Sequence, residues 1–85
     1  MNEYPLSRQI FETAKKHAER LQAARVTRIH LVAGESSGVE AESIRFYFNL
    51  VAKDSPCDGA ELVITAGEGR EFSVESVEVE GLANL

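Results

Sequence analysis

The stretch that most constrains the fold of this chain is Leu31 to Phe48, which reads LVAGESSGVEAESIRFYF. An apolar run leads into the segment Gly34 to Gly38. Two glycines four residues apart predict a turn whose backbone needs conformations or close approaches that a Cβ would obstruct. Beyond the turn, Ile44, Phe48 and Val51 recur at helical spacing and predict the buried stripe of a helix. The stretch therefore predicts a strand–turn–helix unit onto which the other elements pack.

Hydrophobic periodicity predicts the remaining elements on either side of this unit. Apolar residues from Pro5 to Leu21 recur at helical spacing and indicate an amphipathic helix of about five turns. Apolar and polar residues alternate in three further segments, as they do in half-buried strands. The predicted elements are a helix from Pro5 to Leu21, a strand from Thr27 to Ala33, a helix from Ala41 to Lys53, and strands from Glu61 to Ala66 and from Glu71 to Glu80.

The last strand changes phase along its length. Phe72 and Val74 share one parity, whereas Val77 and Val79 share the other. One extra residue near Glu75-Ser76, a β-bulge, would return both pairs to the same face of the sheet. In the first strand, Thr27, Ile29, Leu31 and Ala33 are expected on the core side and Val32 on the outer side. Gly81 to Leu85 is expected to form a loose tail.

The element order α-β-α-β-β predicts an α+β fold. Its simplest form is a two-layer sandwich in which a three-stranded mixed sheet carries two helices on one face. The first strand, second helix and second strand are expected to form a right-handed crossover, and the last two strands a hairpin closed by Gly67-Glu68-Gly69. The strand order stays open. At 85 residues, the chain is expected to be a single domain, residues 1–85.

Charge and hydropathy exclude several classes of partner. A net charge of −5 argues against binding to nucleic acid or to an anionic membrane surface. No apolar run approaches the ~20 residues that a membrane span needs, and the N-terminus lacks the basic-then-apolar pattern of a secretory signal. We therefore expect a cytoplasmic protein.

No catalytic constellation is visible among the reactive side chains. Cys57 is the single cysteine, which leaves no intramolecular disulfide and no thiolate zinc site, and we interpret it as a half-buried loop thiol. His17 and His30 each lack a second ligand at metal-site spacing. Ser36 and Ser37 have no paired base and no GxSxG setting. The sequence therefore predicts a protein that is not an enzyme.

Several segments, in order, resemble the HypA/HybF family of hydrogenase nickel-incorporation proteins. The strongest is Gly34-Glu35-Ser36-Ser37-Gly38-Val39, where the family reads Gly-Glu-Leu-Ser-Gly-Val. The next segment, Ile44-Arg45-Phe46-Tyr47-Phe48, is similar to Leu-Arg-Phe-Ala-Phe. The other matching segments are Met1-Asn2-Glu3-Tyr4, where the family begins Met-His-Glu, Arg25-Val26-Thr27, Gly59-Ala60-Glu61-Leu62 and Ser76-Val77-Glu78-Val79-Glu80.

The resemblance implies a molecule of two parts. One is an α/β nickel-binding domain with two helices on a three-stranded sheet, which agrees with the fold predicted above. The other is a zinc domain with two CxxC pairs, inserted between the second and third strands. Here Ala66 leads through Gly67-Glu68-Gly69 straight into Arg70-Glu71-Phe72. What remains resembles the nickel domain alone, so no zinc is expected.

The resemblance also implies that nickel is held by the N-terminal segment, here Met1, Asn2 and Glu3. In the family, backbone nitrogen near the terminus and the imidazole of the histidine after Met bind the metal, a donor set that suits square-planar Ni(II). In this chain Asn2 takes the place of that histidine. An amide nitrogen has no available lone pair at neutral pH, and its oxygen is a hard, weak ligand. Affinity for Ni(II) is therefore expected to be weak or absent.

Two hypotheses remain open at this stage. In the first, the chain is a HypA-like nickel metallochaperone with a weakened nickel site, and the resemblance implies a nickel-handling maturation GTPase and a hydrogenase large subunit as partners. In the second, it is an interaction or structural module that keeps the fold and has lost both metal sites. Natural loss and engineered deletion both account for the missing insert, but deletion does not by itself explain Asn2. The sequence leaves the oligomeric state open.

Overall fold

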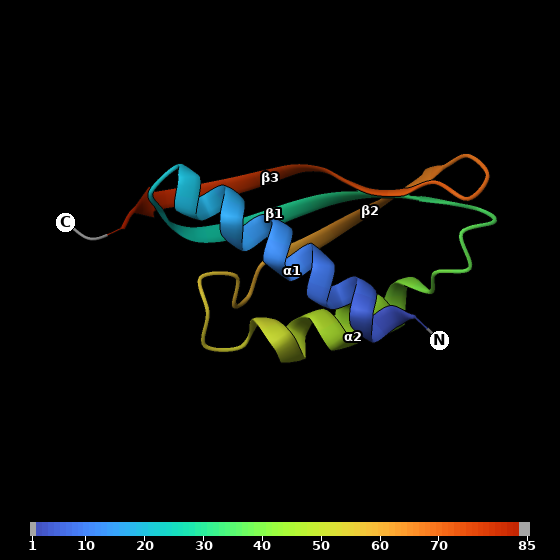
Figure 1. Ribbon diagram of the computed structural model, residues 1–85, viewed down its shortest axis with the longest axis horizontal. Helices are drawn as coiled ribbons and strands as arrows, with labels where there is room; N and C mark the ends of the chain where they lie inside the picture. Colours follow the sequence, from blue (N-terminus) through green and yellow to red (C-terminus); the bar gives the residue numbers. More distant parts are fainter. Residues whose placement is uncertain (1, 84–85) are drawn as a thin grey trace.

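The computed structural model describes residues 2–83. Its elements follow the predicted order α-β-α-β-β, with boundaries within a few residues of those expected (Figure 1). They are α1 (Glu3–Arg20), β1 (Ala23–Gly34), α2 (Ala41–Ala52), β2 (Glu61–Gly67) and β3 (Phe72–Leu82). The α+β fold with its mixed three-stranded sheet is confirmed.

Helix α1 forms because its apolar residues share one face. Its buried residues recur three or four positions apart, at Ser7, Ile10, Phe11, Ala14 and Ala18. Pro5 stands in the first turn, where a missing backbone N–H costs nothing. The helix ends where Gln22 adopts a positive φ of 54°, a conformation that cannot continue a right-handed helix.

The strands are arranged in the order β2-β1-β3, with β1 at the centre. β1 pairs parallel with β2 and antiparallel with β3, so β1, α2 and β2 form the predicted crossover unit. The predicted hairpin between the last two strands is wrong, because β2 and β3 lie on opposite sides of β1. Because β1 has partners along both edges, it is the most buried of the three strands, and it is also the longest.

The connection from β2 to β3 reaches across the end of β1, as Figure 1 shows at its right-hand side. Two backbone bonds hold it there: Gly34 N–H donates to Glu71 O at 2.6 Å, and Ser36 N–H donates to Gly69 O at 2.7 Å. A Cβ on Gly34 would lie 2.3 Å from Gly69 O. The close backbone approach predicted for this turn is therefore confirmed at Gly34. The second glycine of the turn, Gly38, has a positive φ of 75°, the kind of backbone conformation that was also predicted.

The antiparallel pairing of β1 with β3 contains two bulges. Glu75 is the extra residue on β3, between the pairs His30–Ser76 and Leu31–Val74, which confirms the predicted bulge. It brings Phe72 and Val74 onto the same face as Val77 and Val79, and all four pack against the core.

The second bulge, at Thr27 on β1, was not predicted, and it corrects the expected inward face of that strand. Because of it, Val26 is 2% exposed and joins the core, whereas Thr27 is only partly buried. Val32 lies on the outer side as expected but is 7% exposed, since its side chain packs beside Gly67.

The ends of the long strands also differ from expectation. β1 begins at Ala23 rather than Thr27, because Ala23 pairs with Leu82 of β3. Gly81 and Leu82 therefore extend the strand instead of starting a loose tail. Ala83 follows and donates its N–H to Gln22 O at 2.9 Å, and the last two residues of the tail, Asn84 and Leu85, lie outside the described residues.

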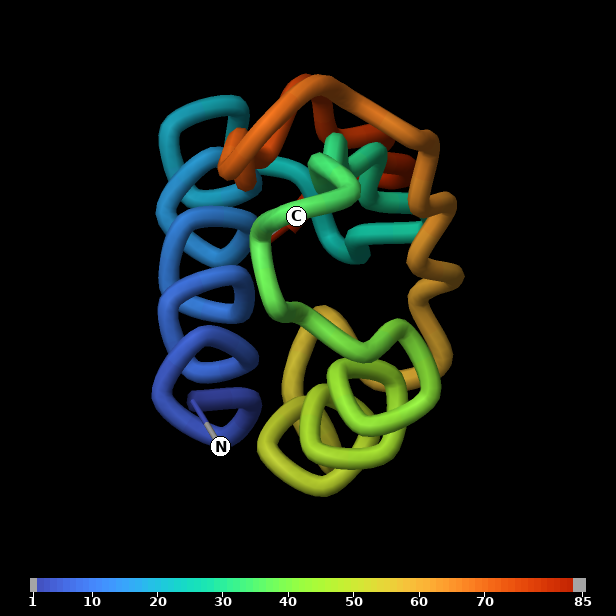
Figure 2. Tube along the Cα trace, turned by 90° about the vertical axis from the view of Figure 1, so that its right-hand side faces the viewer, coloured from blue at the N-terminus to red at the C-terminus, as the bar shows by residue number. Residues whose placement is uncertain are grey.

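Both helices cover the same face of the sheet, and the core lies between the layers. In Figure 2, α1 (blue) runs along the left side and α2 (green to yellow) lies below, with the strands opposite them, above and to the right. The fully buried side chains Ile10, Ile29, Leu31, Ile44 and Phe48 come from both helices and the central strand. Ser7, also buried, donates from Oγ to Ile44 O at 3.1 Å and ties α1 to α2. Among the residues described, no helix combines the length and hydropathy needed to cross a membrane.

Candidate metal centre

The expected nickel-binding segment lies at the start of α1. Asn2 is the residue before the helix, its side chain is exposed and makes no capping hydrogen bond, and its carbonyl accepts the Leu6 N–H at 3.0 Å. Glu3 begins the helix and is partly buried. Met1, the third expected ligand, lies outside the described residues. The side chain of Asn2 is thus free to face an approaching ion, but it offers only an amide.

The fold brings the start of α2 beside this segment. A shallow concavity is lined by Glu3, Tyr4, Glu40, Ser43 and Tyr47. The rings of Tyr4 and Tyr47 meet edge to face with centroids 5.8 Å apart, and Ser43 Oγ donates to Glu40 Oε1 at 2.7 Å. In the sequence, Glu40 directly precedes the helix predicted from Ala41 to Lys53. Its position near Glu3 depends on how α1 and α2 pack together, which periodicity does not reveal.

The side chains of this concavity offer oxygen donors only. Carboxylate and hydroxyl oxygens suit hard cations, whereas Ni(II) favours imidazole and amide nitrogen. Glu3 and Glu40 can lower the local potential for a cation, but they do not replace an imidazole. The side chains that line this concavity therefore offer no donor that would select nickel.

Neither histidine of the chain reaches this end. His17 lies in the last turns of α1, where its Nδ1 is 3.3 Å from an Arg20 guanidinium nitrogen, and it faces β3 across a groove. His30 lies on the outer face of the sheet. Within residues 2–83, no group of three or more His, Cys, Asp or Glu side chains is placed to hold a metal ion. The structure therefore does not bring these two residues together with Asn2 and Glu3.

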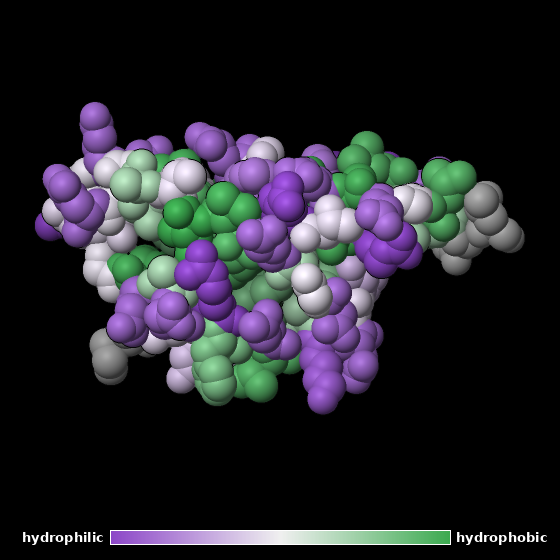
Figure 3. Space-filling model, turned by 180° about the vertical axis from the view of Figure 1, so that it is seen from behind, coloured by the Kyte–Doolittle hydropathy of each residue, from purple (hydrophilic) through white to green (hydrophobic). Residues whose placement is uncertain are grey.

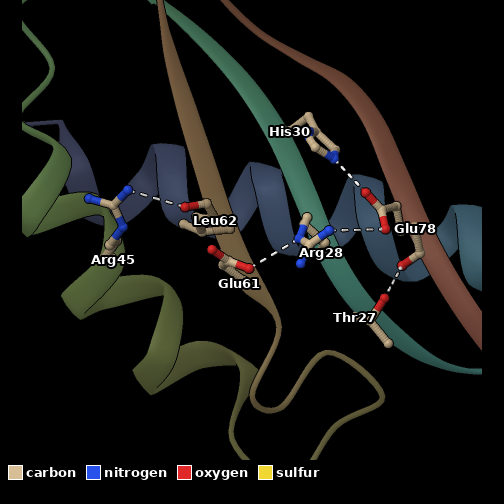
Figure 4. Close-up of polar contacts among 7 residues, drawn as sticks. All are labelled: Thr27, Arg28, His30, Arg45, Glu61, Leu62 and Glu78. Atoms are coloured by element: carbon tan, nitrogen blue, oxygen red, sulfur yellow. Dashed lines mark hydrogen bonds and ion pairs between the residues drawn. The ribbon is translucent and has the colours of Figure 1, made fainter.

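The outer face of the sheet carries a network of ion pairs centred on Glu78 (Figure 4). His30 Nε2 lies 2.6 Å from Glu78 Oε2, and Arg28 Nη1 lies 3.5 Å from Glu78 Oε1. Arg28 Nε also donates to Glu61 Oε1 at 3.0 Å, so the network spans all three strands. The hydrogen bond from His30, with the charge of Arg28, holds the pKa of Glu78 below its ordinary value. These groups satisfy one another, which is the behaviour of a solvated sheet face.

Cys57 is more deeply buried than expected. Its side chain is fully buried in the hydrophobic core rather than half-buried in a loop. Burial raises the pKa of its thiol to about 11, so it is protonated at neutral pH. A protonated, inaccessible thiol serves neither as a nucleophile nor as a metal ligand.

The α+β sandwich, with two helices on one face of a three-stranded sheet, has the architecture implied by the sequence resemblance, and comparisons with known proteins agree. The sequence model of one family, described as "Hydrogenase/urease nickel incorporation, metallochaperone, hypA", matches residues 1–71. The chain belongs to the HypA family.

Curated relatives carry the same family name. The hydrogenase maturation factor HypA of Chlorobaculum parvum is 41% identical over 64 residues, covering 75% of this chain and 57% of the relative. That of Xanthobacter autotrophicus is 30% identical over 84 residues, covering 99% of this chain and 74% of the relative. The chain spans little more than half the length of the first of these.

Solved structures share the fold. The solution structure of the nickel metallochaperone HypA from Helicobacter pylori superposes with a TM-score of 0.79 at 19% identity, covering 96% of this chain and 98% of the other. A second HypA solution structure gives 0.81 at 18% identity, covering 93% and 96%. At this level of identity, the likeness establishes the fold alone.

Proposed function

We propose that residues 1–85 form a single nickel-binding-type domain of a HypA metallochaperone, which takes part in hydrogenase maturation in the cytoplasm and is not an enzyme. The observation that carries this proposal is the family match over residues 1–71, which includes the N-terminal segment expected to hold the metal. The exposure of Asn2 and the partial burial of Glu3 are consistent with a site open to an incoming ion.

In this proposal, nickel binds through Met1, Asn2 and Glu3, with weakened affinity. Glu3 supplies a carboxylate, and the backbone near the terminus supplies nitrogen. Asn2 contributes no imidazole, which removes the strongest side-chain donor for Ni(II). Glu40 lies in the same concavity as Glu3 and adds negative charge. Nickel is cargo in this account, so a site that loads and releases it readily is compatible with transfer.

No zinc site is proposed for residues 1–85. The connection between β2 and β3, where the resemblance implies a zinc domain, consists of residues 68–71. The single cysteine, Cys57, is buried with a raised thiol pKa of about 11. The proposed partners are the nickel-handling maturation GTPase and the hydrogenase large subunit implied by the family resemblance.

A second candidate is a non-metal-binding interaction module that keeps the fold. The replacement of histidine by Asn2 favours it, because it removes the imidazole while the rest of the segment still matches. On this alternative, the chain docks to maturation partners without carrying nickel.

Nickel titration of the chain with its authentic N-terminus distinguishes the proposals. The first predicts binding weaker than micromolar, and the second predicts none. Micromolar or tighter binding by the unmodified chain would contradict a weakened site. A pull-down with the maturation GTPase then tests docking: capture supports a role in maturation, and no capture in the presence or absence of nickel removes the proposed partner.

A further inference from the structure

Helix α2 presents an apolar face to solvent, opposite the face that it buries. Phe46 and Leu50 are 60% and 57% exposed, although Ile44, Phe48 and Ala52 on the other side are at most 1% exposed. Figure 3 shows apolar atoms gathered over α2 at the lower edge of the molecule. Two large apolar side chains one helical turn apart form a patch that the fold itself leaves uncovered.

Charged residues of opposite sign flank this patch along the helix. Glu42 lies one turn before Phe46, and Lys53 follows Leu50 by three residues, both exposed. At 100° per residue, Glu42, Phe46 and Leu50 fall within an arc of about 80°, and Lys53 follows at the C-terminal end of the helix. Within residues 2–83, neither Glu42 nor Lys53 forms an ion pair. The exposed face therefore reads acidic, aromatic, aliphatic, basic from its N-terminal to its C-terminal end.

This order is complementary to itself when reversed. Consider a second copy whose α2 runs antiparallel to the first, related by a two-fold axis that crosses the exposed face at the level of residue 48. Phe46 of each copy then lies against Leu50 of the other, and Glu42 of each copy lies near Lys53 of the other. A parallel copy would instead bring like charges together. We propose that the exposed face of α2 is a self-association surface, at which two copies of this chain pair through antiparallel α2 helices.

The proposed interface is small, and its strength follows from its size. A helix of twelve residues is about 18 Å long, and its face covers well under the ~800 Å² per partner of a stable complex. The pairing is therefore weak and concentration-dependent, with a dissociation constant of about 0.1 to 1 mM. None of its four residues lines the concavity of Glu3 and Glu40, so the inference does not rest on the proposed function.

Sedimentation velocity of the full chain between about 10 µM and 1 mM tests the surface itself. The weight-average sedimentation coefficient should rise towards that of a dimer, and Leu50→Glu or Phe46→Ser should keep it at the monomer value while far-ultraviolet circular dichroism is unchanged. A chain that stays monomeric throughout overturns the proposal and leaves the face to a different partner. Unchanged association of both variants places the contact elsewhere and also overturns it.

Charge reversal tests the antiparallel geometry. Glu42→Lys alone and Lys53→Glu alone should each weaken association at least threefold, because each sets like charges together at two places. The double variant keeps the net charge and should restore the original dissociation constant. Glu19→Lys, an exposed change of the same charge on α1, serves as the control and should have little effect. Failure of the double variant to recover association contradicts the two-fold antiparallel arrangement.

Discussion

Glu78 shows how a single side chain connects two strands on the solvent face of this protein. Its carboxylate accepts from His30 and Arg28, and its backbone carbonyl accepts from Thr27 Oγ1 at 3.3 Å. The three residues that donate these hydrogen bonds are on β1, and all of them are exposed or partly exposed. Because water screens exposed pairs, the network helps fix the register of β1 against β3 more than it stabilises the fold.

The lowered pKa of Glu78 gives a pH-dependent prediction. A carboxyl whose pKa is lower in the folded state stabilises the fold above its ordinary value of 4.5, and this contribution is lost as the pH falls below that value. Glu78→Gln should therefore lower the free energy of unfolding at neutral pH, and the difference should shrink as the pH falls below 4.5 and Glu78 becomes protonated. Urea denaturation at several pH values measures it. Glu75→Gln, on the same strand, is the control, and an equal pH dependence of both variants would refute the assignment.

Gly34 provides a prediction that depends on one backbone contact. A Cβ there would lie 2.3 Å from Gly69 O and 2.6 Å from Glu68 O, both of them backbone atoms that cannot move aside alone. Gly34→Ala should cost about 3 kcal/mol of stability. Gly38→Ala has open space and bears only the strain of a φ of 75°, which is about 1 kcal/mol. Equal losses in urea denaturation would show that the crossing at Gly34 is not tight.

At the scale of elements, the two bulges determine which side chains of β1 and β3 face the core. The two bulges are at Thr27 on β1 and at Glu75 on β3. In the part of the β1–β3 pairing that lies between them the partners are shifted by one residue, and on both sides of that part the register is the same. One bulge lies on each strand, so each offsets the change made by the other. The core thereby receives Val26 from β1, and both pairs of β3, Phe72 with Val74 and Val77 with Val79, pack against it.

Removal of the β3 bulge should disrupt the sheet. Deletion of Glu75 forces either Phe72 and Val74 or Val77 and Val79 onto the outer face, and each side chain so exposed costs about 1.5 to 3 kcal/mol. Loss of more than 3 kcal/mol, or of cooperative unfolding, is expected in thermal denaturation. Glu75→Ala keeps the bulge and should change stability little. A deletion variant as stable as this control would mean that the bulge is dispensable.

The sequence predicted each element because periodicity is a local property, and it predicted the β3 bulge because Phe72 and Val79 conflict in phase. The predicted hairpin between β2 and β3 was wrong, because Gly67-Glu68-Gly69 can form a turn equally well whether the next strand pairs with β2 or crosses over to pair with β1. The position of Glu40 near Glu3 was missed for a similar reason. It arises from the packing of two helices, which short-range pattern does not encode.

At the scale of the whole molecule, the proposed metal site and the sheet are held apart by the helix layer. The N-terminal segment meets the start of α2 at one end, while the charged network of Glu78 occupies the outer face of the sheet. The core contributes no metal donor, since Cys57 is buried and protonated. Nickel binding in this account therefore depends on the first residues of the chain, and Asn2 is the position that limits it.

Nickel binding at the N-terminal segment is tested most directly by calorimetric titration of Ni(II) into the Asn2→His variant with a free N-terminal amine, alongside the unmodified chain. Restoring the imidazole should tighten nickel binding by at least tenfold, about 1.4 kcal/mol. The same variant with an acetylated N-terminus should lose that gain, because the amine is one of the proposed donors. An Asn2→His variant that binds no better than the unmodified chain, or equally well when acetylated, would contradict nickel binding at this segment.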